Sequence, residues 1–342
     1  MMSSANATAW LSGFIPDIPT PFDAAGRIDL PVFARLCERQ VEAGVSAIVV
    51  AETTGEFNTL TTAERDAIIR IAVESARGRV CVIAGAGSNS TAEAIERTRG
   101  AELAGADAVM SVVPYYNKPM QAGIAAHFRA IANATALPIV LHDSPGRTIR
   151  EFADDTLLKL VESPQFIGLR DSSGDIARPM RLRPMLPMRF SLLSGDDATA
   201  LAFLGCGGDG CVSLVSNIVP EMCHAIFSNY RHGQVRTAQQ LQQQLLPLAA
   251  LIAKENPAAV KYALALLGLM RPDTRLPLVG LSDQARQDVA AALVTLVEKD
   301  ITPPDEKNAS RAISALDRAY SGAPVDISSR PNSSRPMCPA RP

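Results

Sequence analysis

Groups that could carry acid–base or carboxylate chemistry stand at the ends of short apolar runs in the sequence. His142 closes the run that begins at Pro138, and Arg170 closes the run that begins at Phe166. An imidazole titrates near neutral pH, and a guanidinium presents a planar fork of donors that suits carboxylates. His142 is therefore a candidate acid or base. Arg170 has two interpretations, an anion-binding cation or one half of a structural salt bridge.

Hydroxyl groups and phenols follow two other apolar runs. Thr53 and Thr54 begin a predicted tight turn whose backbone N–H groups could hold a carboxylate, although such a turn can also be a plain loop. Tyr115 and Tyr116 follow a later run and point to different sides of the chain. One of them could offer its phenol to a proton relay, but two packing aromatics would give the same pattern.

Eight short β-branched runs account for the spacing of these groups. They begin at Phe14, Ala47, Val80, Ala108, Pro138, Phe166, Phe190 and Cys211. Amphipathic stretches lie between them and carry helix-start signals, such as the capping boxes Thr61–Glu64 and Ser90–Glu93. Strands that are apolar throughout are buried on both faces, as in a parallel sheet covered by helices. We therefore predict an α/β protein, a (β/α)8 TIM barrel with additional C-terminal helices.

The barrel prediction places the candidate site. Active sites of such barrels lie at the carboxyl ends of the strands, so the polar groups that close the runs should converge there. Asp196 and Asp197 follow the seventh run, where many barrels bind phosphate, and this acidic pair argues against a phosphorylated substrate.

The chain divides into four predicted segments. We expect an N-terminal extension at 1–13, the barrel at 14–225, C-terminal helices packed on the barrel at 226–301, and a disordered tail at 302–342. The tail is rich in Pro, Ser and Arg, and it has too few apolar groups to offset the entropy of ordering.

The composition of the chain limits the kinds of partner that it is expected to bind. A net charge of -2 gives no broad attraction for nucleic acid, and no apolar stretch approaches the roughly 18 residues of a membrane span. A secretory signal is not supported, so we expect a cytoplasmic protein. No G-x-G-x-x-G or Walker motif is present and the six cysteines form no C-x-x-C pair, so we expect no cofactor, no metal and reduced thiols.

Four strings at the strand ends resemble the dihydrodipicolinate synthase and N-acetylneuraminate lyase family. They are T-T-G-E after the second strand, P-Y-Y-N-K-P after the fourth, P-x-R-T after the fifth and S-G-D-D after the seventh. The resemblance runs from about Phe14 to Leu293 and implies a barrel enzyme that acts on pyruvate or a related keto acid.

The resemblance also implies roles for single residues. Thr53 and Thr54 would bind the keto-acid carboxylate, and Arg147 would bind the carboxylate of a second substrate at the mouth. Gly195 and Val212 match positions that line the pyruvate pocket.

Oligomerisation is implied in the same way. Tyr116 would reach into the proton relay of a neighbouring subunit and act there with Thr53. The family commonly forms tetramers built from two tight dimers, so we expect a homo-oligomer, a tetramer or a dimer.

Two departures from the family pattern bear on the chemistry. Arg170 stands where the family keeps the lysine that condenses with pyruvate to an imine, and His142 stands where it keeps a tyrosine. Imine formation needs an unprotonated amine, whereas a guanidinium stays protonated at any working pH. His142 can still transfer protons. Lys118, in the loop after the fourth strand, is a weaker candidate for a substitute nucleophile.

Three functions compete at this stage. The first is a lyase or aldolase that acts on a small 2-keto acid or related carboxylate without an imine. In it Arg170 stabilises charge, and His142, Tyr116 and Thr53 complete the catalytic set. The second is a catalytically silent member that binds a small carboxylate as a sensor or partner subunit. The third, a metal-dependent aldolase, would use His142, Asp143, Asp171 and Glu56 as ligands.

Overall fold

The computed structural model describes residues 8–300, and these form a barrel of eight parallel strands. The strands are β1 (Gly13–Pro16), β2 (Ala47–Val50), β3 (Cys81–Gly85), β4 (Ala108–Val112), β5 (Ile139–Asp143), β6 (Phe166–Asp171), β7 (Ser191–Ser194) and β8 (Gly210–Ser213). Neighbours in sequence pair from β2 through β8, and β8 pairs with β1. A bridge between Asp17 and Val49 joins β1 to β2. The predicted (β/α)8 barrel is thereby confirmed.

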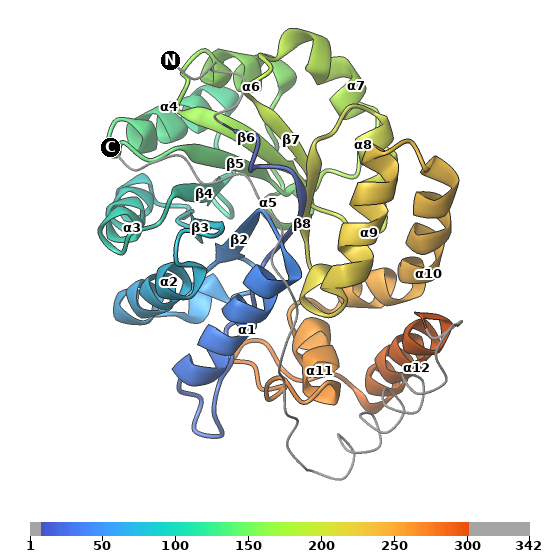
Figure 1. The fold of residues 1–342 in the computed structure, drawn as a ribbon. Helices are drawn as coiled ribbons and strands as arrows, with labels where there is room; N and C mark the ends of the chain where they lie inside the picture. The colour runs from blue at the N-terminus through green and yellow to red at the C-terminus, as the bar shows by residue number, and fades with distance from the viewer. Residues whose placement is uncertain (1–7, 301–342) are drawn as a thin grey trace.

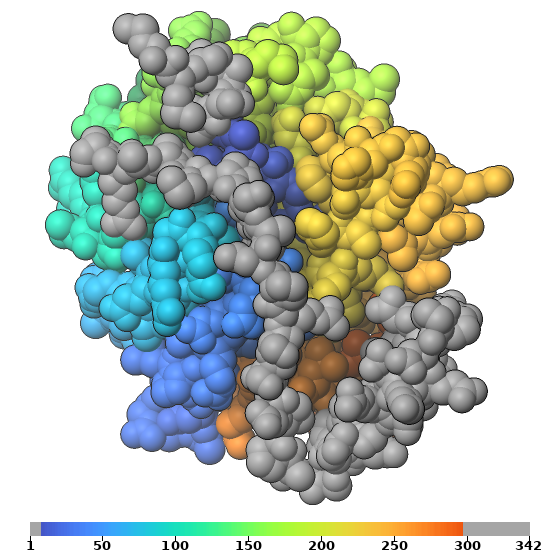
Figure 2. All heavy atoms as spheres, viewed as in Figure 1, coloured from blue at the N-terminus to red at the C-terminus, as the bar shows by residue number. Residues whose placement is uncertain are grey.

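Helices surround the strands, as Figure 1 shows. Those between the strands are α1 (Leu30–Ala43), α2 (Thr62–Ala76), α3 (Thr91–Leu103), α4 (Gln121–Ala132), α5 (Pro145–Thr148), α6 (Asp154–Val161), α7 (Arg178–Leu182) and α8 (Ala200–Gly205). After β8 come α9 (Pro220–Arg231), α10 (Val235–Lys254), α11 (Ala258–Leu266) and α12 (Asp283–Asp300). In Figure 2 the colours run in chain order around the molecule, so segments that are successive in sequence lie next to one another. The additional C-terminal helices are confirmed, and α10 packs against both α9 and α12.

Local sequence signals explain where helices begin. Thr61 caps α2, and its hydroxyl and the Glu64 carboxylate satisfy each other's backbone N–H groups as a complete capping box. Ser90 caps α3 by accepting from the Glu93 N–H at 3.4 Å. The Glu93 carboxylate instead binds Ser88 and Arg97, so the second predicted box is only half formed.

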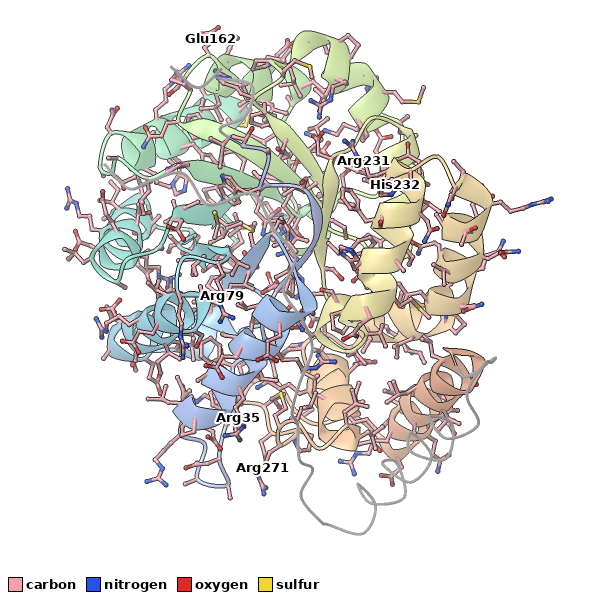
Figure 3. All side chains as sticks on the ribbon, in the orientation of Figure 1. Arg35, Arg79, Glu162, Arg231, His232 and Arg271 are labelled. Carbon is pink, nitrogen blue, oxygen red and sulfur yellow. The ribbon has the colours of Figure 1, made fainter. Side chains whose placement is uncertain are left out.

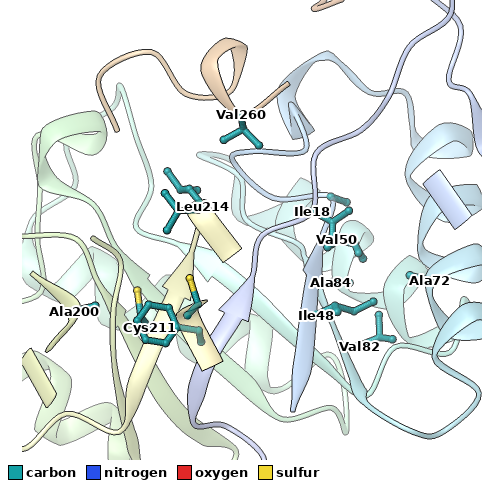
Figure 4. Packing of buried hydrophobic residues seen from close by; sticks show 14 of the residues in the cluster. Ile18, Ile48, Val50, Ala72, Val82, Ala84, Ala200, Cys211, Leu214 and Val260 are labelled. Atoms are coloured by element: carbon teal, nitrogen blue, oxygen red, sulfur yellow. The ribbon is translucent and has the colours of Figure 1, made fainter. Parts of the chain in front are cut away.

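The core has two layers because successive strand residues point to opposite faces. One face of each strand fills the barrel interior, where Ile15, Val49, Met110 and Val212 meet. The other face packs against the helices. Figure 4 shows this outer layer, with strand residues such as Val50 among its members.

Charged side chains divide between surface and interior. The side chains labelled in Figure 3, among them Arg35, Glu162 and Arg271, are exposed. Arg65, Arg170, Arg178 and Lys261 are buried instead. In the described part of the chain, no helix is long and apolar enough to cross a membrane.

The cysteines agree only partly with the expectation of reduced thiols. The free ones are Cys37, Cys206, Cys211 and Cys223. Cys81, the first residue of β3, is disulfide-bonded, which corrects the expectation at this position. Cys338 lies outside the described residues.

Candidate active site

Four ionisable side chains form a buried chain of contacts at the carboxyl ends of the strands. Arg170 Nη1 lies 3.1 Å from Asp17 Oδ2 and 3.2 Å from Glu52 Oε2. The other oxygen of Glu52, Oε1, lies 3.0 Å from His142 Nδ1. All four side chains are at most 4% exposed. The predicted acid–base group, His142, and the predicted cation, Arg170, are therefore brought together. Glu52 lies between them, and Asp17 contacts Arg170.

Strand register explains why these groups meet. His142 of β5 pairs with Arg170 of β6, so both side chains point to the same side of the sheet. Val140, two residues before His142, belongs to the interior cluster. Met110 Sδ, from the same cluster, lies 4.0 Å from Arg170 Nη1, so the cluster sits directly on the apolar interior.

Burial and charge act against each other in the pKa values of this cluster. Burial raises the pKa of Asp17 to about 6, although Arg170 draws it down. Burial would also raise the pKa of Glu52, but attraction from His142 and Arg170 with hydrogen bonds from His142 and Thr53 overcomes it and holds that pKa well below its usual range. Burial lowers the pKa of Arg170 less than the two acids raise it, so the guanidinium stays charged.

The contacts of His142 leave one of its ring nitrogens able to accept a proton. Burial lowers its pKa more than Glu52 raises it, so the imidazole is neutral at pH 7. An ionised carboxylate only accepts hydrogen bonds, so Nδ1 carries the proton, and the Nδ1–H group donates a hydrogen bond to Glu52. The Nε2 atom, which makes no hydrogen bond to any residue of 8–300, then keeps its lone pair. A carboxylate that orients a histidine in this way is a common arrangement for a general base.

Backbone N–H groups in the turn after β2 donate hydrogen bonds to two carboxylates of the protein itself. The Thr53 N–H donates to the Glu52 carboxylate, and the Thr54 N–H donates to Asp17 Oδ2 at 3.4 Å. The Thr54 hydroxyl accepts from Asn256 Nδ2 at 3.4 Å. Both backbone donors predicted to hold a substrate carboxylate therefore lie at the cluster and contact internal carboxylates.

The other predicted residues lie around this centre. Arg147 is exposed on α5, and its charge helps to lower the pKa of His142. Val212 lies in the barrel interior. Gly195 donates its N–H to the Asp171 carbonyl at 2.7 Å, and a side chain there would collide with Ser172. Tyr116 is 89% exposed with a φ of 70°, so it lies outside the buried cluster.

A second ionic network lies on the opposite face of the same two strands. Asp143 and Asp171 follow His142 and Arg170 by one residue and therefore point outward, where Arg178 Nη1 contacts them at 2.8 and 3.5 Å. Arg178 also donates to the Phe152 carbonyl at 2.7 Å.

This division corrects the metal hypothesis. Of its four ligands, His142 faces inward, Asp143 and Asp171 face Arg178, and Glu56 is paired with Lys261. Within residues 8–300 there is no group of three or more His, Cys, Asp or Glu side chains placed to hold a metal ion. The metal-dependent aldolase prediction is therefore wrong for this arrangement of residues.

Sequence reasoning missed Asp17 and Asn256 and gave Glu52 no role. Asp17 interrupts the first apolar run, and an acid inside a buried strand-like run is a signal that could have been used. Asn256 lies 202 residues from its partner Thr54, and no local pattern links the two.

The fold and this polar mouth define a (β/α)8-barrel protein whose site combines a permanent cation, a carboxylate-oriented histidine and carboxylate-binding backbone groups. Residues 10–296 match the model of the dihydrodipicolinate synthetase family. The chain belongs to that family, as its resemblance had indicated.

Named relatives support this membership. The chain is 43% identical over 290 residues to the 4-hydroxy-tetrahydrodipicolinate synthase of Gluconobacter oxydans, covering 84% of this chain and 98% of that protein. The solved synthase of Methylacidiphilum fumariolicum superposes with a TM-score of 0.82 at 39% identity, covering 90% and 99%. A dihydrodipicolinate synthase from Acinetobacter baumannii, solved with pyruvate, gives 0.81 at 37% identity, covering 83% and 98%.

Proposed function

We propose that the chain is a carbon–carbon or carbon–oxygen lyase or aldolase that acts on a small 2-keto acid or related carboxylate without a lysine imine. The observation that carries this proposal is the buried Glu52–His142 hydrogen bond beside Arg170. It supplies a base and a fixed positive charge at the place where barrel enzymes hold their substrates.

The proposed chemistry follows from these groups. His142 Nε2 takes a proton from the carbon next to the keto group, and Arg170 stabilises the enolate oxygen that forms. The enolate carbon then attacks the carbonyl of a second substrate, and the imidazolium returns its proton to the new alkoxide. Cleavage is the reverse. Arg170 remains a guanidinium throughout, because it has no free amine to attack a carbonyl.

The proposed function also assigns roles to the other predicted site residues. The turn at Thr53 and Thr54 and the exposed Arg147 bind carboxylates, with Gly195 and Val212 beside the ligand. Tyr116, whose exposed side chain leaves it free to contact another subunit, joins the relay at Thr53 of a neighbouring copy. The relative solved with pyruvate supports a keto acid as the ligand class.

Borohydride trapping tests the absence of an imine. Treatment with pyruvate and borohydride is expected to leave the mass of the protein unchanged, whereas an adduct on any lysine would overturn the proposal. His142→Ala is expected to abolish turnover across a panel of keto acids and aldehydes. Asp143→Asn, one residue away but on the outer face, serves as the control and should retain turnover.

A second candidate, a silent member that binds a small carboxylate as a sensor or partner subunit, is favoured by one observation. Arg170 and the Thr53 and Thr54 N–H groups already contact the protein's own acids. Calorimetry that detects pyruvate binding, together with no conversion of any compound in the panel, would support this candidate over the enzyme.

A further inference from the structure

The donors that would receive a ligand carboxylate are occupied by internal carboxylates. Asp17 Oδ2 contacts both Arg170 Nη1 at 3.1 Å and the Thr54 N–H at 3.4 Å. Glu52 contacts Arg170, His142 and the Thr53 N–H. A ligand carboxylate can bind Arg170 Nη1 and the N–H groups of this turn only if one of the two internal acids gives way.

Hydrogen bonding distinguishes the two acids. Both oxygens of Glu52 are bonded, one to His142 and the other to Arg170 and the Thr53 N–H. Asp17 keeps one oxygen, Oδ1, that is buried and has no partner. Arg170 Nε is also a buried donor without a partner. Asp17 is therefore the less firmly held acid, and Arg170 retains a free donor for a ligand oxygen.

Charge then limits how a carboxylate can enter. At neutral pH the cluster holds two carboxylates, one guanidinium and a neutral imidazole, which leaves one excess negative charge. A second excess negative charge in a buried site is costly unless a group is neutralised. Protonation of Asp17 removes the excess charge and frees Arg170 Nη1 and the Thr54 N–H.

We propose that Asp17 controls carboxylate binding: a ligand carboxylate replaces it on Arg170 and the Thr54 N–H, and Asp17 takes up one proton from solvent as the ligand binds. This inference rests on the proposed carboxylate-binding function. Burial raises the pKa of Asp17 to about 6, so at pH 7 to 8 most molecules must take up the proton on binding.

After burial, the groups with the largest effects on the pKa of Asp17 are Arg170 from β6, Glu52 after β2 and Thr54. The Thr54 N–H also donates to Asp17 Oδ2. His142 lies behind Glu52 and is affected in turn by Arg147. Cys211 of β8 acts on Arg170, but burial raises the pKa of its thiol, so it stays uncharged.

Calorimetric titration of the full chain with pyruvate between pH 6 and 8.5 tests the proposal. The dissociation constant of the wild type is expected to rise about tenfold per pH unit above pH 6. Repeating the titration at pH 8 in buffers of different ionisation enthalpy should show uptake of about one proton per pyruvate, a measurement that requires no variant.

Asp17→Asn is expected to bind pyruvate with an affinity independent of pH in this range, and about a hundredfold more tightly than the wild type at pH 8. Asp143→Asn is the matched control, because burial also raises the pKa of Asp143 to about 6 but its side chain faces Arg178. The control should keep the wild-type pH dependence. Binding without pH dependence in the wild type, or an unchanged slope in Asp17→Asn, would overturn the inference and leave the proposed function standing. Absence of pyruvate binding in both proteins at every pH would overturn both.

Discussion

At the scale of single residues, Arg170 is significant because of the two acids that hold it. Position 170 is flanked by Asp17 and Glu52 at 3.1 and 3.2 Å. Two nearby carboxylates favour the protonated form of any amine placed between them. A change at position 170 alone would therefore give the side chain of an imine-forming lysine without its reactivity.

This argument gives a prediction about imine formation. Arg170→Lys treated with pyruvate and borohydride at pH 7 is expected to trap little pyruvate, because the ammonium stays protonated. Adding Asp17→Asn should increase trapping about tenfold for each pKa unit by which the amine is lowered. Mass spectrometry measures the adduct, and Arg170→Lys with Asp143→Asn is the control. Equal trapping in the two double variants would contradict the prediction.

His127 gives a residue-scale prediction about stability. It is buried on α4, with Nδ1 3.0 Å from the Thr91 hydroxyl, and burial lowers its pKa to about 4. Because the folded pKa lies below the unfolded value near 6.5, the unfolded state binds more protons between these values. The contribution of neutral His127 is therefore present above about pH 6.5 and is lost as pH falls toward 4, by up to about 3 kcal/mol.

Urea unfolding from pH 7 to 4.5 measures this effect. His127→Asn should show a shallower loss of unfolding free energy than the wild type over that range. His232→Asn changes an exposed histidine at the end of α9 and should leave the wild-type dependence in place. Parallel curves for His127→Asn and wild type would count against the assignment.

At the scale of elements, a buried ion pair links helix α11 to the turn after β2. Lys261 of α11 is ion-paired with Glu56, and both side chains are fully buried. Its ammonium also donates to the Asp273 carbonyl at 2.9 Å and lies 4.1 Å from the centre of the Phe22 ring. The C-terminal helices thus help to hold the turn that carries Thr54.

Removing one partner of this pair should be more harmful than removing both. Lys261→Met leaves a buried carboxylate without its cation and is expected to lower the unfolding free energy by about 3–5 kcal/mol. The double variant Glu56→Gln with Lys261→Met should recover most of that loss, as measured by urea denaturation. A double variant no more stable than the single one would show that the ion pair is not the cause.

The elements were largely predictable, but the links between them were not. Continuous apolar runs and complete caps such as Thr61–Glu64 are local signals, and the structure confirms the strands and helices that they indicated. Asp17 meets Arg170 across 153 residues, and the inward or outward direction of each acid depends on strand register. Proximity along the chain carries no information about such contacts, so the metal hypothesis grouped His142 with Asp143 and Asp171, which point to the opposite face of the strands.

At the scale of the whole molecule, three exposed apolar side chains lie in the loops that follow β4 and β5. Tyr116, Met120 and Ile149 are 89%, 75% and 64% exposed. Their loops are joined by a hydrogen bond from Gln121 to the Glu151 carbonyl at 2.8 Å. A group of exposed apolar residues near a site is typical of an interaction surface.

We predict that this surface joins copies of the chain. Met120→Asp with Ile149→Asp is expected to sediment as a smaller species than the wild type in sedimentation velocity, because burying two carboxylates at an interface between copies is costly. Leu103→Asp, which changes a residue 89% exposed on α3, is the control and should leave the mass unchanged. An unaltered mass in the double variant would place the contact elsewhere.

The pairing of β5 with β6 has a consequence for the charge of the entire mouth. His142 lies opposite Arg170, and Asp143 lies opposite Asp171. A slip of either strand by one position would turn its side chains to the other face. If both strands slipped, Asp143 and Asp171 would replace the base and the only guanidinium of the cluster, and its one excess negative charge would rise to four. The irregular pairing at Ile139 and Val140 adjoins this stretch, so the charge of the mouth depends on the alignment of the backbone as well as on residue type.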